Sequence, residues 1–333
     1  MRIRSTVCAA LFSSAACAAD ISAFFTADYS NVITGGIRED STLRALAGLS
    51  IEHQLSDDWL FYAEGQLQRG NNGSDSVGDL QAFSNIDEDD FSRLYAAWLQ
   101  WQIHENWQLT VGQQDANAEF AVADNAGEFI NSSMGFSPTI GFLPTYPLPR
   151  LAITSAYQQD NHRFSAGLFA DDDNRLDAPF YIAEYQLAGE LIWKLGLWHK
   201  RHADSLLGEK NITGGYAILQ PAETQSSHLG NWYIQLGASP NDAEITRHVG
   251  IGSSWASVPS RPDDSWGLGV SHLQTSKLAS ELRRSECSIE LYYRAQLYPQ
   301  LAVKPELQWI QHPAAAPEAD DALVFTLRFE LTL

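Results

Sequence analysis

The sequence contains three cysteines, and two of them, Cys8 and Cys17, lie close to its N-terminus. If residues 1–19 are removed as a secretory signal, Cys287 remains alone. A disulfide bond within the mature chain is then excluded. An exported protein of this composition must therefore draw its stability from a source other than disulfide bridges.

The N-terminal segment has the three parts of a signal peptide. Arg2 and Arg4 precede a short apolar run at Val7–Phe12, and small residues follow at Ala16–Ala18. The apolar run is too short to cross a bilayer as a helix. The sequence therefore predicts export, with residues 1–19 cleaved and residues 20–333 forming the mature protein.

Long hydrophobic runs and basic residues are also scarce. Beyond the signal segment, no apolar run approaches the roughly 18 residues of a membrane-spanning helix. The chain has 21 Lys and Arg against 41 Asp and Glu, a net charge of −20 that becomes −22 without Arg2 and Arg4. Binding of nucleic acid is excluded, because it needs the opposite sign of charge. With 44% hydrophobic residues, the chain is either a soluble β protein or an outer-membrane barrel.

The dominant pattern is an alternation of apolar and polar residues with period two. Near the C-terminus, Leu327, Phe329 and Leu331 alternate with Arg328 and Glu330. Such alternation is typical of strands with one apolar and one polar face. Tryptophans recur beside the predicted turns, where a membrane barrel carries its aromatic girdles and a soluble β-sandwich does not.

About sixteen such segments follow one another between residues 20 and 333, and their lengths bracket the 9–11 residues that cross a bilayer as a tilted strand. Short and long connections alternate between them. This layout predicts an all-β fold, a transmembrane antiparallel β-barrel of about 16 strands in one domain, with short periplasmic turns and long outer loops. It places the protein in the Gram-negative outer membrane, in contact with lipid and lipopolysaccharide.

The longest central gap between predicted strands, residues 112–149, is both acidic and apolar. It carries Asp115, Glu119, Asp124 and Glu128 among aromatic and small residues. A loop of this length is usually functional or disordered, and this one is too apolar for a flexible linker. We expect it to fold into the mouth of the barrel and to control what passes.

Several stretches, in order along more than two hundred residues, resemble the carbohydrate-selective porins of the OprB family. They are 93–100 (RLYAAWLQ), 112–115 (GQQD) with Glu119–Phe120 and 129–133 (FINSS), 144–149 (PTYPLP), 261–264 (RPDD), 290–297 (ELYYRAQL) and 305–310 (PELQWI). The resemblance implies a sixteen-stranded barrel that passes neutral sugars by diffusion, with residues 112–149 as the infolded constriction. It implies no cofactor and no metal.

The chain departs from this pattern in three places. Ala96 stands where an acidic residue often occurs in the family, and the mature chain is short, which favours trimmed outer loops. Leu333 replaces the terminal aromatic residue that is common in outer-membrane barrels, which predicts weaker recognition by the barrel assembly machinery. The sequence does not decide between a monomer and a homotrimer.

Strand parity supplies candidate pore-lining residues independently of the resemblance. Arg294, Lys304 and Arg328 are predicted to face inward on consecutive strands, and barrel closure would bring Arg44 near them. Such a basic wall opposite the acidic loop would set a transverse field across the constriction, while Trp98 and Trp198 could stack on sugar rings. The full candidate set is Arg44, Glu64, Trp98, Asp115, Glu119, Phe120, Asp124, Glu128, Trp198, Arg294, Lys304 and Arg328, with Lys194 also facing inward.

Each candidate has a structural alternative. Inward charges can pair across strands and stiffen the wall, and the loop carboxylates can be ordinary solvated charges. The acidic runs Asp87–Asp90 and Asp171–Asp173 are interpreted as solvated outer-loop faces, because no ligand spacing for a divalent ion supports them.

Enzymatic interpretations are disfavoured. The histidines and serines are not spaced to form a nucleophile, base and orienting group, and nothing fixes the separation of a glycosidase-like carboxylate pair. The leading hypothesis is a sugar-selective diffusion porin. A general or cation-preferring porin and a structural or surface-interaction barrel with a plugged lumen are the alternatives.

Overall fold

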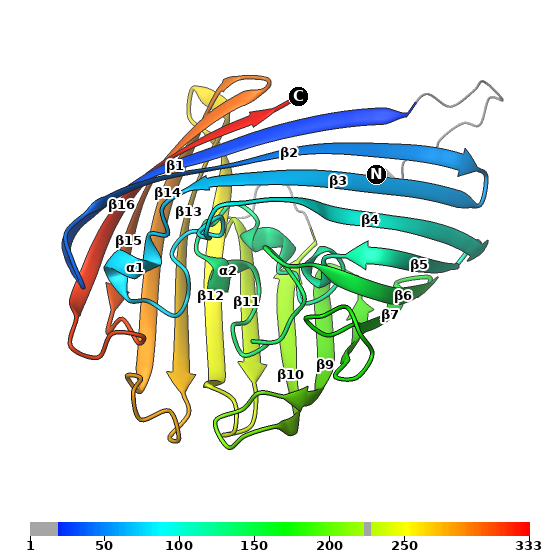
Figure 1. Ribbon diagram of the computed structural model, residues 1–333. Coiled ribbons are helices and arrows are strands. Elements are labelled where there is room, and N and C mark those ends of the chain that lie inside the picture. Colours follow the sequence, from blue (N-terminus) through cyan, green and yellow to red (C-terminus); the bar gives the residue numbers. More distant parts are fainter. Residues whose placement is uncertain (1–18, 223–227) are drawn as a thin grey trace.

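In the computed structural model, which describes residues 19–222 and 228–333, sixteen strands form one closed antiparallel barrel (Figure 1). Each strand pairs with its neighbours in sequence, and β16 closes onto β1. The fold predicted from the sequence is confirmed. The predicted signal peptide lies outside the described residues, except for residue 19. The strands are β1 (Asp20–Gly36), β2 (Ser41–Ser56), β3 (Trp59–Gly70), β4 (Phe91–His104), β5 (Trp107–Gln114), β6 (Arg150–Gln159), β7 (His162–Phe169), β8 (Phe180–Leu187), β9 (Leu191–Ala203), β10 (Lys210–Pro221), β11 (Asn231–Ala238), β12 (Ile245–Val258), β13 (Arg261–Thr275), β14 (Ser285–Tyr298), β15 (Leu301–Gln311) and β16 (Asp320–Thr332).

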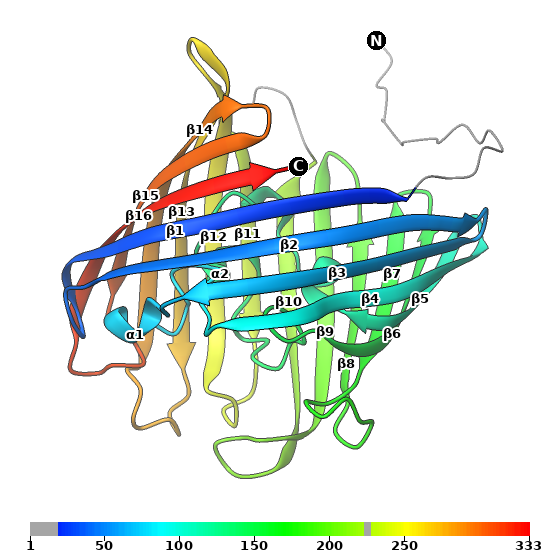
Figure 2. The same cartoon turned by 45° about the horizontal axis from the view of Figure 1, so that its top comes forward.

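The connections distinguish the two ends of the barrel. At the short-turn end, turns such as 57–58 and 105–106 join neighbouring strands. Strand β1 begins and strand β16 ends at this same end (Figure 2). At the long-loop end, residues 71–90 join β3 to β4 and residues 115–149 join β5 to β6. We refer to these segments as loop 2 and loop 3. In barrels of this layout the short turns face the periplasm.

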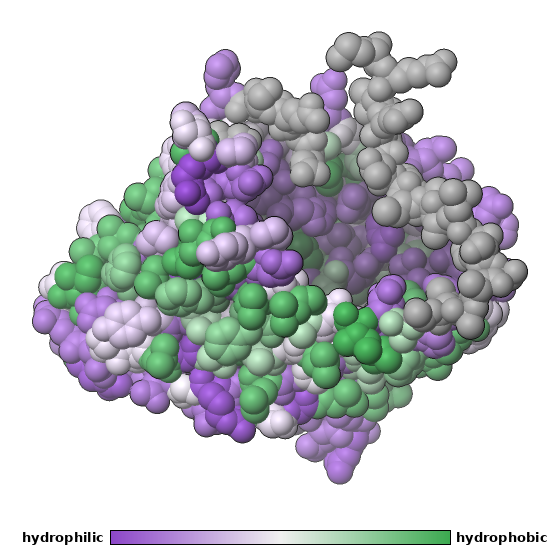
Figure 3. Space-filling model, turned by 90° about the horizontal axis from the view of Figure 1, so that it is seen from above, coloured by the Kyte–Doolittle hydropathy of each residue, from purple (hydrophilic) through white to green (hydrophobic). Residues whose placement is uncertain are grey.

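The strands alternate as the sequence pattern predicts. On β15, Lys304 and Glu306 are 2% exposed, whereas Leu307 and Trp309 between the inward positions are 39% and 44% exposed. Because a bilayer, and not water, surrounds the outer face, the apolar residues point outward and the polar residues point into the lumen. Seen from the short-turn end, hydrophilic side chains line the hollow interior (Figure 3).

Loop 3 folds into the lumen and forms a hydrophobic core there against the barrel wall. It contains two 3₁₀ turns, η1 (Ala116–Ala118) and η2 (Asp124–Ala126), and the short helix α2 (Ser132–Gly135). Phe129 contacts the inward rings of Tyr233 and Tyr292 edge-on, at centroid distances of 5.9 and 5.1 Å. The apolar residues of the loop are thus used to fix it to the wall.

Loop 2, which contains the helix α1 (Ser74–Val77), also packs inside the barrel. Val77 and Phe83 are completely buried, and the two loops exchange backbone hydrogen bonds, from the Asn85 N–H to the Ile130 carbonyl and from the Ser132 N–H to the Ala82 carbonyl. The interpretation of the Asp87–Asp90 run as a solvated face is therefore wrong for its first residue. The Asp87 carboxylate is 1% exposed because it is buried against an arginine of the wall.

Candidate permeation pathway

Three of the predicted loop carboxylates contact basic residues of the barrel wall. Glu119 accepts from Arg163 Nη2 of β7 at 2.7 Å, and Asp124 lies 2.8 Å from Lys194 Nζ of β9. Glu128 pairs with Lys304 Nζ at 3.0 Å and with Arg294 Nε at 3.4 Å. The structure thus brings Glu128, Arg294 and Lys304 together as one cluster, to which Glu330 adds a further carboxylate.

These contacts correct the expected transverse field. We expected the acidic loop and the basic wall to face each other across an open constriction, but the ion pairs listed above join them directly. Two of these basic residues also bind the backbone of the loop: Lys194 donates to the Val122 carbonyl and Lys304 to the Glu128 carbonyl, both at 2.8 Å. The charges therefore hold loop 3 against the wall, and only the exposed parts of Glu119, Asp124 and Glu128, 32%, 53% and 42% of their side chains, face water.

Inward carboxylates of the wall hold the loops through backbone N–H groups. Glu290 of β14 accepts from the N–H groups of Ile130 and Asn131 at 2.8 and 3.0 Å. Glu286, on the same strand, accepts from Leu80 and Gln81 of loop 2 at 2.9 and 3.1 Å. Buried carboxylates are costly unless they are hydrogen-bonded, and here the backbones of the two loops supply the donors.

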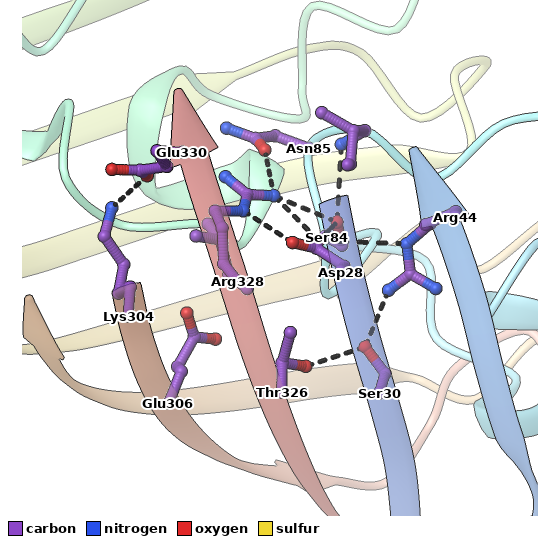
Figure 4. A network of polar contacts seen from close by, with 12 residues as sticks. Asp28, Ser30, Arg44, Ser84, Asn85, Lys304, Glu306, Thr326, Arg328 and Glu330 are labelled. Atoms are coloured by element: carbon purple, nitrogen blue, oxygen red, sulfur yellow. Dashed lines mark hydrogen bonds and ion pairs between the residues drawn. The ribbon is translucent and has the colours of Figure 1, made fainter. Parts of the chain in front are cut away.

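Arg44 and Arg328 lie in a buried network where the barrel closes (Figure 4). In the register, Asp28 of β1 pairs with Arg44 of β2 on one side and with Arg328 of β16 on the other. Arg328 makes a bidentate contact with Asp28, and Arg44 Nε lies 3.1 Å from Asp87 of loop 2. Arg44 is fully buried and Arg328 is 5% exposed. The two arginines pair within the wall and with loop 2, as the structural alternative for inward charges describes.

Two predicted aromatic candidates, one on the wall and one on loop 3, are covered by protein. Trp198 is 1% exposed and packs between Phe142 of loop 3 and Phe180 of β8, at centroid distances of 6.2 and 6.1 Å. Phe120 is completely buried and meets Phe169 edge-on. The prediction that Trp198 offers a ring face to a solute is corrected, because the apolar side of loop 3 occupies that face.

Three other predicted residues, Trp98, Glu64 and Asp115, line unoccupied volume inside the barrel. Together with Glu119 they border a cavity of about 420 Å³ between loop 3 and the short-turn end, lined by inward side chains of β3 to β6. A second cavity, of about 650 Å³, lies on the long-loop side between loops 2 and 3. We call these the lower and the upper cavity. Asp115 borders both of them.

A further space lies beneath the middle of loop 3. Gly127 borders the upper cavity and this space of about 600 Å³, which Asp124, Glu128 and Gln220 line. The exposed predicted residues thus gather around two volumes under loop 3, one on the side of β3 to β6 and one on the side of β9 to β12.

Asp115 caps the first turn of loop 3. Its carboxylate accepts from the Asn117 N–H at 2.8 Å and from the Tyr95 hydroxyl of β4. Burial raises the pKa of the Asp115 carboxyl, and these hydrogen bonds offset part of the rise. The group therefore loses its negative charge at a higher pH than a free aspartate.

Parity reasoning missed Asp28, Tyr62 and Tyr95. Tyr62 lies two positions before Glu64 on the polar face of its strand, so the pattern could have found it. Strict alternation places Tyr95 on the face opposite to Trp98, and it is buried inside because the register between β3 and β4 shifts beside it. Asp28 could not be found in this way, because its importance follows from the register between β1 and β16. In the described residues, no group of three or more His, Cys, Asp or Glu side chains is arranged to hold a metal ion.

The chain matches one family model, described as carbohydrate-selective porin, OprB family, over residues 42–233 and 209–333. No curated protein sequence matches it. The structure of Pseudomonas putida OprB at high pH is 16% identical, covers 95% of this chain and 94% of its own, and superimposes with a TM-score of 0.81. The Acinetobacter baumannii outer-membrane channel DcaP is 12% identical, with 97% and 99% covered and a TM-score of 0.64.

Salmonella typhi OmpF, in a complex with daunomycin, is 10% identical, with 96% of this chain and 98% of that chain covered and a TM-score of 0.66. At these identities the structures share the fold. The family and the fold are those of an outer-membrane channel rather than an enzyme. The match over residues 42–333 shows that the chain belongs to the OprB family of carbohydrate-selective porins.

Proposed function

We propose that neutral sugars diffuse through this barrel from the upper cavity, past the edge of loop 3, into the space beneath it. The observation that carries the proposal is that Asp115 borders the free volume on both sides of loop 3. Loops 2 and 3 are fixed to the wall by ion pairs and hydrogen bonds, so they narrow the lumen permanently. A fixed, narrow and polar passage suits solutes that exchange water for hydroxyl contacts of moderate strength.

Three predicted carboxylates contribute to this passage mainly by positioning loop 3. Glu119, Asp124 and Glu128 are paired with Arg163, Lys194 and Lys304, so a large part of their charge is compensated. Their exposed oxygens remain acceptors for sugar hydroxyls, and the paired cations supply donors beside them. Such contacts are weak enough for a solute to leave again.

The test is conductance and permeation of the purified barrel. In planar bilayers we expect stable channels whose current falls when millimolar D-glucose is added, and in liposomes we expect swelling in isotonic glucose. A channel with unchanged current and no glucose permeation contradicts sugar transport. Absence of any channel supports instead the alternative of a structural barrel with a plugged lumen.

A cation preference is a second candidate property, which one observation favours. Glu64 of β3 and Asp115 of loop 3 accept hydrogen bonds from the uncharged hydroxyls of Tyr62 and Tyr95. The other three predicted carboxylates of loop 3 pair with cations. Uncompensated carboxylates in a pore attract cations. The reversal potential in a KCl gradient measures this preference. Glu64→Gln and Asp115→Asn should each reduce it, and Asp177→Asn, an exposed change in an outer loop, should not.

The outward apolar side chains fit contact with lipid and lipopolysaccharide. Insertion through the barrel assembly machinery and assembly as a homotrimer remain predictions. Crosslinking in native membranes tests the trimer, and the rate of barrel insertion with and without the assembly machinery tests the part of that machinery.

A further inference from the structure

The lower cavity combines the features of a small-molecule site. Its volume of about 420 Å³ is in the range of ligand pockets, which are commonly lined by aromatic rings and a few polar groups that fix orientation. It lies on the short-turn side of Asp115, beyond the narrowing made by the two loops. Its lining comes from the rigid strands β3 to β6 and the first turn of loop 3.

Two aromatic rings form a platform in this cavity. Tyr62 and Trp98 are directly paired across β3 and β4, and their rings are stacked with centroids 5.0 Å apart and planes 18° apart. The Tyr62 hydroxyl donates to Glu64 at 2.5 Å, which fixes the orientation of the ring. Trp98 is half-buried, in contrast to the fully covered Trp198.

The neighbouring strand, β5, presents no side chain to the Trp98 ring. Gly112 of β5 pairs with Trp98, has a φ of +141°, and would place a Cβ only 2.3 Å from the Ala97 carbonyl oxygen. An L-residue is strained at this position whatever its size. Glycine therefore leaves the side of Trp98 that faces β5 without a neighbouring side chain.

Two glutamines supply free hydrogen-bonding groups around the platform. Gln100 and Gln108 line the cavity and are partly exposed. No residue in the described parts of the chain forms a hydrogen bond with either side-chain amide, whereas Gln114, nearby, is engaged with Thr154. An amide offers both a donor and an acceptor, as a vicinal pair of hydroxyls requires.

We propose that the lower cavity is a binding subsite for one neutral pyranose ring, with the Tyr62–Trp98 platform against its apolar face and Gln100 and Gln108 at its hydroxyls. The inference rests on the proposed sugar transport and deepens it. Because the subsite lies on the short-turn side of the narrowing, sugar from that side reaches it directly. Sugar from the long-loop side must first pass Asp115, so association from the two sides differs, although the equilibrium affinity does not.

The test is current-noise analysis of single channels with D-glucose added to one side at a time. We expect faster association from the short-turn side. Trp98→Ala should weaken the block about three- to tenfold, Trp98→Phe should restore part of it, and Gln108→Ala should weaken it as well. Trp193→Ala is the matched control, since that tryptophan is 46% exposed on the outer face.

Liposome swelling in glucose, measured on the same variants, separates the two proposals. If glucose permeates but Trp98→Ala and Gln108→Ala leave the block unchanged, the subsite is refuted and sugar transport stands. Equal association rates from both sides also refute it. If glucose neither permeates nor blocks the unchanged channel, sugar transport and the subsite fall together.

Discussion

Arg328 of the last strand donates two hydrogen bonds to Asp28 of the first, from Nε to Oδ1 at 2.7 Å and from Nη2 to Oδ2 at 2.9 Å. The pair lies directly opposite in the register that closes the barrel. Arg328 Nη2 also donates to Asn85 of loop 2 at 2.8 Å. One ion pair thus joins the first and last strands of the barrel and fixes an infolded loop (Figure 4).

Replacing Asp28 by Asn should destabilise the barrel strongly. The change leaves Arg328 and Arg44 buried with one fewer carboxylate, and breaking a buried pair in this way costs about 3 kcal/mol or more. The urea midpoint of the folded barrel in detergent should fall markedly. Asp40→Asn, which removes the exposed pair with Arg38, should change the free energy of unfolding by less than about 1 kcal/mol and leave the midpoint nearly unchanged. Equal midpoints for the two variants would contradict a buried closing pair.

The inward direction of Arg44, Lys304 and Arg328 could be predicted because it depends only on the period of the strand. Each occupies a polar position between apolar neighbours, and no knowledge of distant residues is needed. Their partners could not be predicted in the same way. Asp28 and Arg328 are 300 residues apart, and only the register of closure places them opposite each other.

The infolding of loop 3 could be predicted from the sequence, whereas the infolding of loop 2 could not. Loop 3 combines four carboxylates with many apolar residues, which is a local signal that it packs against something. Loop 2 ends in the acidic run Asp87–Asp90, whose composition resembles a solvated surface. Asp87 is nevertheless buried, because Arg44 faces it from the wall and compensates its charge.

The ion-pair cluster at Lys304 should control how firmly loop 3 is held. Lys304→Met removes contacts with the carboxylate and the carbonyl of Glu128, a loss of roughly 2 kcal/mol in loop docking. It also removes the ion pair with Glu330, which lies within the wall. We expect a larger and noisier single-channel conductance, because the loop leaves the wall part of the time. Lys277→Met, an exposed change at the long-loop end, is the control. A quiet channel of normal conductance in Lys304→Met would show that this cluster does not hold the loop.

The stability of loop 2 should depend on pH through Asp79. Burial and the neighbouring Asp87 raise the pKa of the Asp79 carboxyl from 3.8 to about 6, and Glu286 also faces it. A raised carboxyl pKa means that the folded state binds the proton more tightly than the unfolded state. The contribution to stability is therefore complete below pH 4 and is lost as the pH rises through 6, an effect on the order of 3 kcal/mol.

Hydrogen exchange of the Leu80 and Gln81 amides, which donate to Glu286, measures this local stability. Their protection factors should fall between about pH 4 and pH 6.5 in the unchanged chain. Asp79→Asn should reduce that fall, because the amide has no proton to lose in this range. The same slope in both proteins would exclude Asp79 as its cause.

Gly112 should be intolerant of even the smallest side chain. A Cβ there would lie 2.3 Å from the Ala97 carbonyl oxygen and 2.6 Å from the Trp98 Cα, at a φ of +141°. Both contacts are with the backbone of the paired strand, which cannot yield without moving β4. Gly112→Ala should therefore lower the urea midpoint by the equivalent of about 1–3 kcal/mol and displace Trp98. In Gly141→Ala the added Cβ meets open space, so this loop 3 variant should fold and conduct normally. If the two alanine variants unfold at the same urea concentration, β4 and β5 are not held as closely as the structure shows.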